Sequence, residues 1–157
     1  MKPLNIYILQ QSLYNSTFPK IILKILENSK KGYILCKNKE EMKQLDNLLW
    51  TFSQLSFLPH ATEEDDYQEA QSLLLITKCP ASNLNDKFLI LTSEDLFLEK
   101  YILEYTKLFI ITTQQVDIQK FIDSIGTKTD EVQIKYFLQN YDASWVQQGE
   151  VLSRMEK

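Results

Sequence analysis

The sequence predicts a three-layer α/β/α domain with a mainly parallel sheet, and three observations support that fold class. Short apolar, β-branched runs alternate with segments of helical apolar spacing through the first 52 residues. A strand–helix–strand–helix rhythm implies parallel strands with helices packed on the sheet faces, joined by right-handed crossovers. The length of 157 residues fits one domain, and a hydrophobic content of 44% is enough for a core.

The opening of the chain predicts two strands and two helices. Residues 4–9 and 33–36 are apolar and β-branched or aromatic, as buried strands are. Between them, Thr17 is placed to cap a helix, and Gly32 is placed to end it in the left-handed conformation.

The second helix is expected to begin at a capping box formed by Asn38 and Glu41. Its apolar residues then follow helical spacing, at Met42, Leu45, Leu49 and Phe52.

The rest of the chain predicts further strands and helices around an irregular stretch at residues 53–71. Strands are expected at residues 72–77, 88–92 and 108–111, with a C-terminal edge strand at 143–147. Helices are expected at residues 95–105, 115–125 and 129–140. The domain then covers residues 1–148, and residues 149–157 form a charged tail that frays.

Composition excludes several function classes. The three glycines stand alone, so no glycine-rich phosphate loop and no nucleophile elbow is present. The single histidine, His60, precedes an acidic run at residues 63–66, but the spacing matches no metal motif and favours a solvated loop. Glu41 and Asp46 are interpreted as surface charges of the second helix. The sequence therefore predicts no catalytic residue, no metal site and no cofactor.

Charge and cysteine content bear on location and partners. The net charge is −4, with +4 in residues 1–60 and −8 in the remainder, and there is one arginine. Proteins that bind duplex DNA directly present a basic field, so we expect only indirect contact with DNA. Two cysteines and no long apolar run predict reduced thiols in a cytoplasmic protein with no membrane contact.

Two groups of residues are candidates for partner binding. Trp50 and Phe57 belong to a dense apolar cluster at a helix end and its loop, which fits either an interface or core packing. Lys135 and Tyr136, with Lys128, combine cations and an aromatic on the expected last helix. Such a patch suits an acidic peptide end with an aromatic residue, although a solvated lysine face is the commoner arrangement.

These residues resemble a known family. Leu49-Trp50 followed by Phe57-Leu58-Pro59-His60 is similar to the signature of the chi subunit of bacterial DNA polymerase III. The ending Trp145-Val146-Gln147-Gln148 resembles that of alphaproteobacterial members. The resemblance covers most of the chain and implies a Rossmann-like fold without nucleotide chemistry.

The resemblance also implies a role. Chi is a non-catalytic accessory protein of the clamp-loader assembly that binds the acidic C-terminal tail of single-stranded DNA-binding protein, and often a psi subunit. It places Trp50, Phe57, Pro59 and His60 on the face for psi or a helicase-type partner, with Pro59 and His60 shaping a loop. It assigns tail binding to a strand end and a helix, here Ile111, Thr112, Lys128, Lys135 and Tyr136. Gln133 and Phe137 depart from the family pattern at this site.

Two alternatives stay open at this point. One is a nucleotide-binding enzyme with a Rossmann-like fold, against which the missing glycine loops count. The other is an interaction scaffold unrelated to replication.

Overall fold

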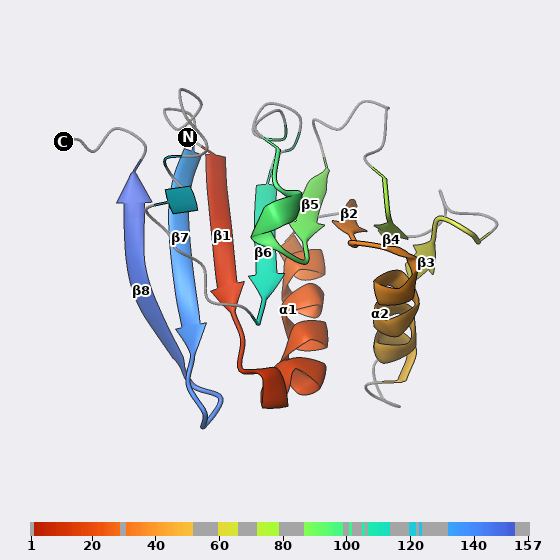
Figure 1. The fold of residues 1–157 in the computed structure, drawn as a ribbon, viewed down its shortest axis with the longest axis horizontal. Coiled ribbons are helices and arrows are strands. Elements are labelled where there is room, and N and C mark those ends of the chain that lie inside the picture. The colour runs from red at the N-terminus through yellow and green to blue at the C-terminus, as the bar shows by residue number, and fades with distance from the viewer. Residues whose placement is uncertain are drawn as a thin grey trace.

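One eight-stranded sheet organises the protein (Figure 1). The computed structural model describes residues 2–28, 31–51, 60–65, 72–78, 87–98, 101, 105, 107–113, 120–121, 123 and 132–152, with the backbone alone for residues 2, 132 and 146–152. The strands follow the order β3-β4-β2-β5-β6-β1-β7-β8 across the sheet. Every neighbouring pair is parallel except β7 and β8. Their bounds are β1 (Lys2–Ile8), β2 (Gly32–Leu35), β3 (His60–Thr62), β4 (Leu73–Ile76), β5 (Phe88–Leu91), β6 (Lys107–Thr112), β7 (Val132–Gln139) and β8 (Trp145–Leu152).

Helical segments lie on both faces of this sheet, which confirms the three-layer prediction. The helices α1 (Tyr14–Asn28) and α2 (Lys39–Thr51) cover one face (Figure 1). The short 3₁₀ helix η3 (Glu94–Leu96) and the helical residues Tyr101 and Phe121 lie on the other. A second 3₁₀ turn, η1 (Gln11–Leu13), leads from β1 into α1. In the described part of the chain no helix is long and apolar enough to cross a bilayer.

Each face of the sheet has its own apolar core. On one face the fully buried residues of α1 and α2, such as Ile22 and Met42, pack on Ile34 and Ile90 of the sheet. On the other face, Tyr101, Tyr105 and Phe121 pack on apolar residues of β1, β2, β5 and β6. Burial of this kind on both faces explains why the central strands are almost continuously apolar in sequence.

The predicted parallel strands and the second helix are confirmed. The five strands expected at residues 4–9, 33–36, 72–77, 88–92 and 108–111 correspond to β1, β2, β4, β5 and β6. In α2, the Asn38 Oδ1 atom accepts a 2.9 Å hydrogen bond from the Glu41 N–H. The Glu41 carboxylate accepts from the Lys37 N–H at 2.8 Å, one residue earlier than a standard capping box.

The helix expected at residues 129–140 is wrong, because residues 132–139 form strand β7 beside β1. Ile134, Phe137 and Leu138 have helical spacing, which favoured a helix. In the structure Ile134, Tyr136 and Leu138 instead alternate toward one core of the sheet. The edge strand expected at 143–147 is confirmed as β8, which continues to Leu152, into the stretch expected to be a tail.

Several smaller predictions are also wrong. The α1 helix begins at Tyr14, so Thr17 lies in its first turn and caps nothing. Gly32 starts β2, where a Cβ atom would overlap the ring of Phe88, so close packing and not a helix end requires glycine there. The expected helix at 95–105 opens as η3 and breaks at Phe97, whose backbone is extended.

The stretch expected to be irregular contains one further strand. His60 lies in β3, which pairs with β4, and it does not shape a loop. A run of three residues is too short to give a period-two signal in sequence.

Candidate functional site: an aromatic groove beside α1

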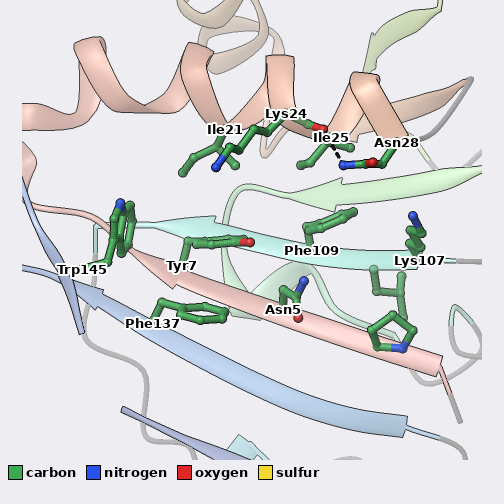
Figure 2. A pocket seen from close by; sticks show the side chains of 12 residues that line it. Asn5, Tyr7, Ile21, Lys24, Ile25, Asn28, Lys107, Phe109, Phe137 and Trp145 are labelled. Carbon is green, nitrogen blue, oxygen red and sulfur yellow. Dashed lines mark hydrogen bonds between the residues drawn. The ribbon is translucent and has the colours of Figure 1, made fainter. Parts of the chain in front are cut away.

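The α1 helix leaves part of its sheet face uncovered, and a groove forms there (Figure 2). Its cavity has a volume of about 670 Å³. Residues from β1, α1, β6, β7 and β8 line it: Pro3, Asn5, Tyr7, Ile21, Lys24, Ile25, Asn28, Lys107, Leu108, Phe109, Phe137 and Trp145. A smaller cavity of about 300 Å³ adjoins it and adds Thr17, Lys20, Gln139 and Ala143. We call the two cavities together the α1 groove.

Three aromatic side chains form the floor at one end of this groove. Tyr7 of β1 and Phe137 of β7 are register partners, and their rings stack with centroids 5.1 Å apart. Trp145, at the start of β8, meets Tyr7 edge-on at 5.7 Å and is 39% exposed. Burial raises the pKa of Tyr7, and a contact with the Asn5 side chain partly opposes this shift. An aromatic ligand group can therefore pack here with favourable geometry.

The α1 helix forms the opposite wall. Ile21 and Ile25 present apolar surface, while Lys20 and Lys24 lie one turn apart along the same wall. In Figure 2, Trp145 lies at one end of the larger cavity, and Asn28 and Lys107 lie at the other. The groove therefore has an apolar centre and polar, cationic ends.

The charged side chains in the described lining of the groove are all cationic. Its described lining contains the cations Lys20, Lys24 and Lys107 and no carboxylate. This is unusual in a chain whose net charge is −4. A partner carrying negative charge is favoured here, because cations at a partly desolvated surface attract it and disfavour cationic competitors.

A hydrogen-bonded turn fixes the end of the groove near Trp145. The Asn140 N–H donates to the Ser144 carbonyl at 2.8 Å, and the Ala143 N–H donates to the Asn140 carbonyl at 3.0 Å. Ala143 has a φ of 73°, a left-handed conformation that costs a non-glycine residue about 1–2 kcal/mol. Buried Gln139 ties this end to Gln10, which follows β1, and to Thr17 of α1, through hydrogen bonds of 2.9–3.1 Å.

The carboxyl ends of the parallel strands form a second, polar crevice of about 390 Å³. The Glu41 carboxylate lies there and accepts a 2.7 Å hydrogen bond from the Thr92 hydroxyl. Burial, and next the Glu41 charge, raise the pKa of Tyr14 well above its usual range and that of Cys36 to about 12. Lys37 lines the same crevice, so its charge is mixed.

The structure separates two of the residues expected to bind an acidic tail. Lys135 and Tyr136 are adjacent in β7 and so point to opposite faces of the sheet. Tyr136 packs on the core opposite α1, and Ile111 and Thr112 are buried within β6. Lys128 lies outside the described residues. Lys135 lies on the same face of the sheet as Phe137, which lines the groove. The family resemblance marks Phe137 only as a departure from the family pattern.

The expected psi face is described only in part. Trp50 is 51% exposed, and its ring lies 4.6 Å from that of His60, whose side chain is fully buried. The His60 Nε2 atom lies 3.0 Å from the Asp46 carboxylate, so Asp46 is a partner of His60 in addition to being a helix charge. Phe57 and Pro59 lie outside the described residues.

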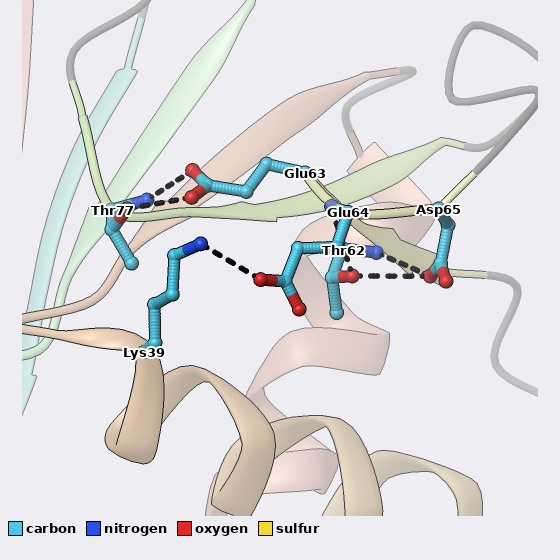
Figure 3. Close-up of polar contacts among 6 residues, drawn as sticks. All are labelled: Lys39, Thr62, Glu63, Glu64, Asp65 and Thr77. Carbon is cyan, nitrogen blue, oxygen red and sulfur yellow. Dashed lines mark hydrogen bonds and ion pairs between the residues drawn. The ribbon is translucent and has the colours of Figure 1, made fainter.

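The acidic run after His60 has structural partners (Figure 3). Glu63 accepts two 2.7 Å hydrogen bonds from the Thr77 backbone and hydroxyl. Glu64 pairs with Lys39 at 2.8 Å, and Asp65 accepts from the Thr62 N–H at 2.8 Å. In the described ranges no three histidine, cysteine or acidic side chains are placed to hold a metal ion.

Comparison with solved structures supports the fold. The helicase domain of Pyrococcus furiosus Hef superposes with a TM-score of 0.54 over 88% of this chain. The chain spans 35% of that domain, and at 14% identity the likeness concerns the fold alone.

Comparison of sequences places the chain in a family. A probable DNA polymerase III subunit chi from Rickettsia prowazekii (strain Madrid E) is 28% identical over 154 residues, which are 90% of this chain and 93% of that protein. The family model described as DNA polymerase III chi subunit, HolC, matches residues 1–120. Because this match covers most of its length, the chain belongs to the DNA polymerase III chi subunit family.

Proposed function

We propose that this chi-family protein docks the acidic C-terminal tail of single-stranded DNA-binding protein. As a non-catalytic accessory subunit in the cytoplasm, it thereby links the clamp loader of DNA polymerase III to coated template and contacts DNA only indirectly. Membership of the chi family supports an accessory role in replication.

The α1 groove is the observation that carries this proposal. It combines stacked aromatic rings with three lysines and, among its described residues, no carboxylate. An acidic peptide that carries an aromatic residue needs both an apolar slot and nearby cations.

The energies indicate that the apolar slot dominates. Burial of a Phe-sized side chain contributes about 1.5–3 kcal/mol, whereas an exposed ion pair contributes about 0.2–1 kcal/mol. Micromolar binding requires about −8 kcal/mol, so backbone contacts and several charges must add to the aromatic contact. A tetrameric partner that presents several tails also gains by avidity.

Titration calorimetry with a peptide of the cognate tail tests the proposal. We expect micromolar binding that weakens as salt is raised, because exposed charges contribute to it. A peptide with the acidic residues replaced by their amides serves as control and should bind more weakly. Absence of binding by the acidic peptide at low salt contradicts the proposed function.

We also propose a second docking face around Trp50, for a psi subunit or a helicase-type partner of the clamp loader. A half-exposed Trp supported by the buried His60 ring is a typical interface anchor. Phe57 and Pro59 belong to this proposed face by sequence. Trp50→Ala should abolish capture of that partner while leaving tail binding and cooperative melting intact. Unchanged capture by Trp50→Ala removes this face from the proposal.

A further inference from the structure

We infer that Asp46 and His60 are positioning residues that hold the Trp50 indole in one orientation at the surface of the protein. The His60 side chain is fully buried and acts through Trp50, while Asp46 acts through His60. The inference rests on the proposed docking face around Trp50. It adds to that face the two residues that prepare its anchor before a partner arrives.

Trp50 lies where the helix itself restrains a side chain least. It is the penultimate residue of α2, which ends at Thr51, and it is half-exposed. Helix ends fray, and exposed side chains change rotamer on the picosecond-to-nanosecond timescale. A fixed orientation of the indole at this position therefore depends on contacts with side chains from outside the helix end.

His60 supplies such a contact from the sheet. It opens β3 and is the register partner of Leu73 in β4. The centroid of its ring lies 4.6 Å from that of the Trp50 ring, with an angle of 47° between the two planes. This separation is short for a contact between rings, so the imidazole packs directly against the indole. Because His60 belongs to the sheet, it is a firmer support than a neighbour in the last turn of α2.

Asp46 fixes the orientation of the His60 ring. It precedes Trp50 by four residues in α2, so the two side chains lie one turn apart on the same side of the helix. The Asp46 carboxylate lies 3.0 Å from the His60 Nε2 atom. An ionised carboxylate can only accept a hydrogen bond, which assigns a proton to Nε2. The hydrogen bond limits rotation of the imidazole and thereby of the indole packed on it.

Core packing alone does not explain a histidine at this position. Ala61 and Thr62, the other residues of β3, are buried as well, and buried strands favour apolar, β-branched side chains. A buried imidazole costs free energy unless its nitrogen atoms are hydrogen-bonded, whereas an apolar side chain needs no carboxylate partner. A polar ring held between Asp46 and Trp50 is better explained by the orientation that it gives to its exposed neighbour.

An oriented anchor favours binding because less conformational freedom is lost when the partner docks. Removing either support should therefore weaken docking by about three- to tenfold. The indole itself remains in such variants, so the loss should be smaller than in Trp50→Ala.

The first measurement reads the mobility of Trp50 in the free protein. It uses a Trp145→Phe background, which leaves Trp50 as the one tryptophan of the chain. Trp145 lies in β8 and His60 in β3, at opposite edges of the sheet, so this background does not touch the surroundings of Trp50. In time-resolved fluorescence anisotropy we expect little fast depolarisation while Asp46 and His60 are intact.

Two variants should raise the fast depolarisation. His60→Gln retains a side-chain N–H for Asp46 but has no ring to support the indole. Asp46→Ala keeps the ring but removes the carboxylate that orients it. Because Asp46 is part-exposed, this second variant decides the question even if His60→Gln does not fold.

Two matched controls separate positioning from a general loss of structure. Asp46→Asn keeps an acceptor oxygen for the Nε2 hydrogen and should restore the low mobility that Asp46→Ala loses. Glu40→Ala removes an exposed carboxylate from the same helix and should behave like the unaltered protein. Urea denaturation gives the stability of each variant. A loss of stability in Asp46→Ala with no change in the mobility of Trp50 shows a structural role only and overturns the inference.

The second measurement is the affinity for purified psi subunit, by titration calorimetry. Asp46→Ala and His60→Gln should bind about three- to tenfold more weakly than the unaltered protein, and Asp46→Asn about equally. If Trp50 becomes mobile but the affinity for psi is unchanged, orientation of the indole does not serve docking and the inference is wrong. If psi does not bind even the unaltered protein, psi is excluded as the partner of this face, while the anisotropy measurement still decides whether Asp46 and His60 position Trp50.

Discussion

The α1 face of the sheet has two halves that differ in what covers them. Over β2 and β5, the helices close the face, and Ile34 and Ile90 are fully buried. Over β1 and β7 the face opens into the α1 groove, where Tyr7 and Phe137 are only partly buried. The closed half holds the domain together, and the open half presents side chains suited to a partner.

The sequence of β1 reflects this difference between a covered and an open face. Leu4, Ile6 and Ile8 face the core opposite α1 and are almost fully buried, whereas Asn5 and Tyr7 face the groove. A strand covered on both faces is continuously apolar, while one open face produces alternation. Amphipathic residues within a central strand can therefore mark an uncovered binding face.

The largest expected effect compares two adjacent residues of α1. Ile22 is fully buried in the closed half, so Ile22→Ala should lower the free energy of unfolding by about 2–5 kcal/mol and leave tail affinity unchanged. Ile21 lines the groove, so Ile21→Ala should cost little stability and weaken tail binding. Urea denaturation and calorimetry measure the two quantities. Equal stability losses would mean that the two halves do not differ as described.

A smaller effect comes from pH and concerns the closed half. Burial raises the pKa of Cys36 from about 9 to about 12. Above pH 9 the thiol ionises in the unfolded chain but not in the folded one, so stability falls as pH rises from 9 toward 12. At pH 10 this amounts to about 1 kcal/mol.

Thermal melts between pH 8 and pH 10.5 measure the Cys36 effect. Cys36→Val should melt with a shallower pH dependence than the unaltered protein, because it keeps the apolar packing and has no thiol. An identical slope for both proteins contradicts a buried neutral thiol at this position.

The smallest effect is expected at the end of the open half. Ala143 has a left-handed backbone, so Ala143→Gly should relieve strain and raise stability by up to about 1 kcal/mol. Because Ala143 and Trp145 both line the smaller cavity, the same change should slightly weaken tail binding. A melting temperature below that of the unaltered protein would contradict strain at this turn.

Much of the fold was predictable because the strands and helices of the closed half have regular apolar patterns in the sequence. Apolar runs gave five parallel strands, and α2 followed from its cap and from the spacing of Met42, Leu45 and Leu49. Strand β7 was not predictable in this way, since Phe137 interrupts its alternation. The Phe137 ring stacks on Tyr7 of β1. This contact joins distant parts of the sequence, so local patterns do not predict it.

The candidate site was less predictable than the fold. Trp50 and His60 do come together, but the Asp46 contact with His60 links two segments that sequence alone does not place side by side. The groove combines residues near both ends of the chain with α1 and Lys107, and no local spacing connects them. The one available signal was the alternation of Asn5 and Tyr7 with apolar neighbours.

The position of β1 between β6 and β7 has a consequence during synthesis of the protein. The groove joins Tyr7, made near the start of translation, to Phe137 and Trp145, made near its end. Domains fold as the chain leaves the ribosome, so the parallel core can form while the α1 groove is still incomplete. A nascent or prematurely terminated chain therefore lacks part of the aromatic floor of the α1 groove.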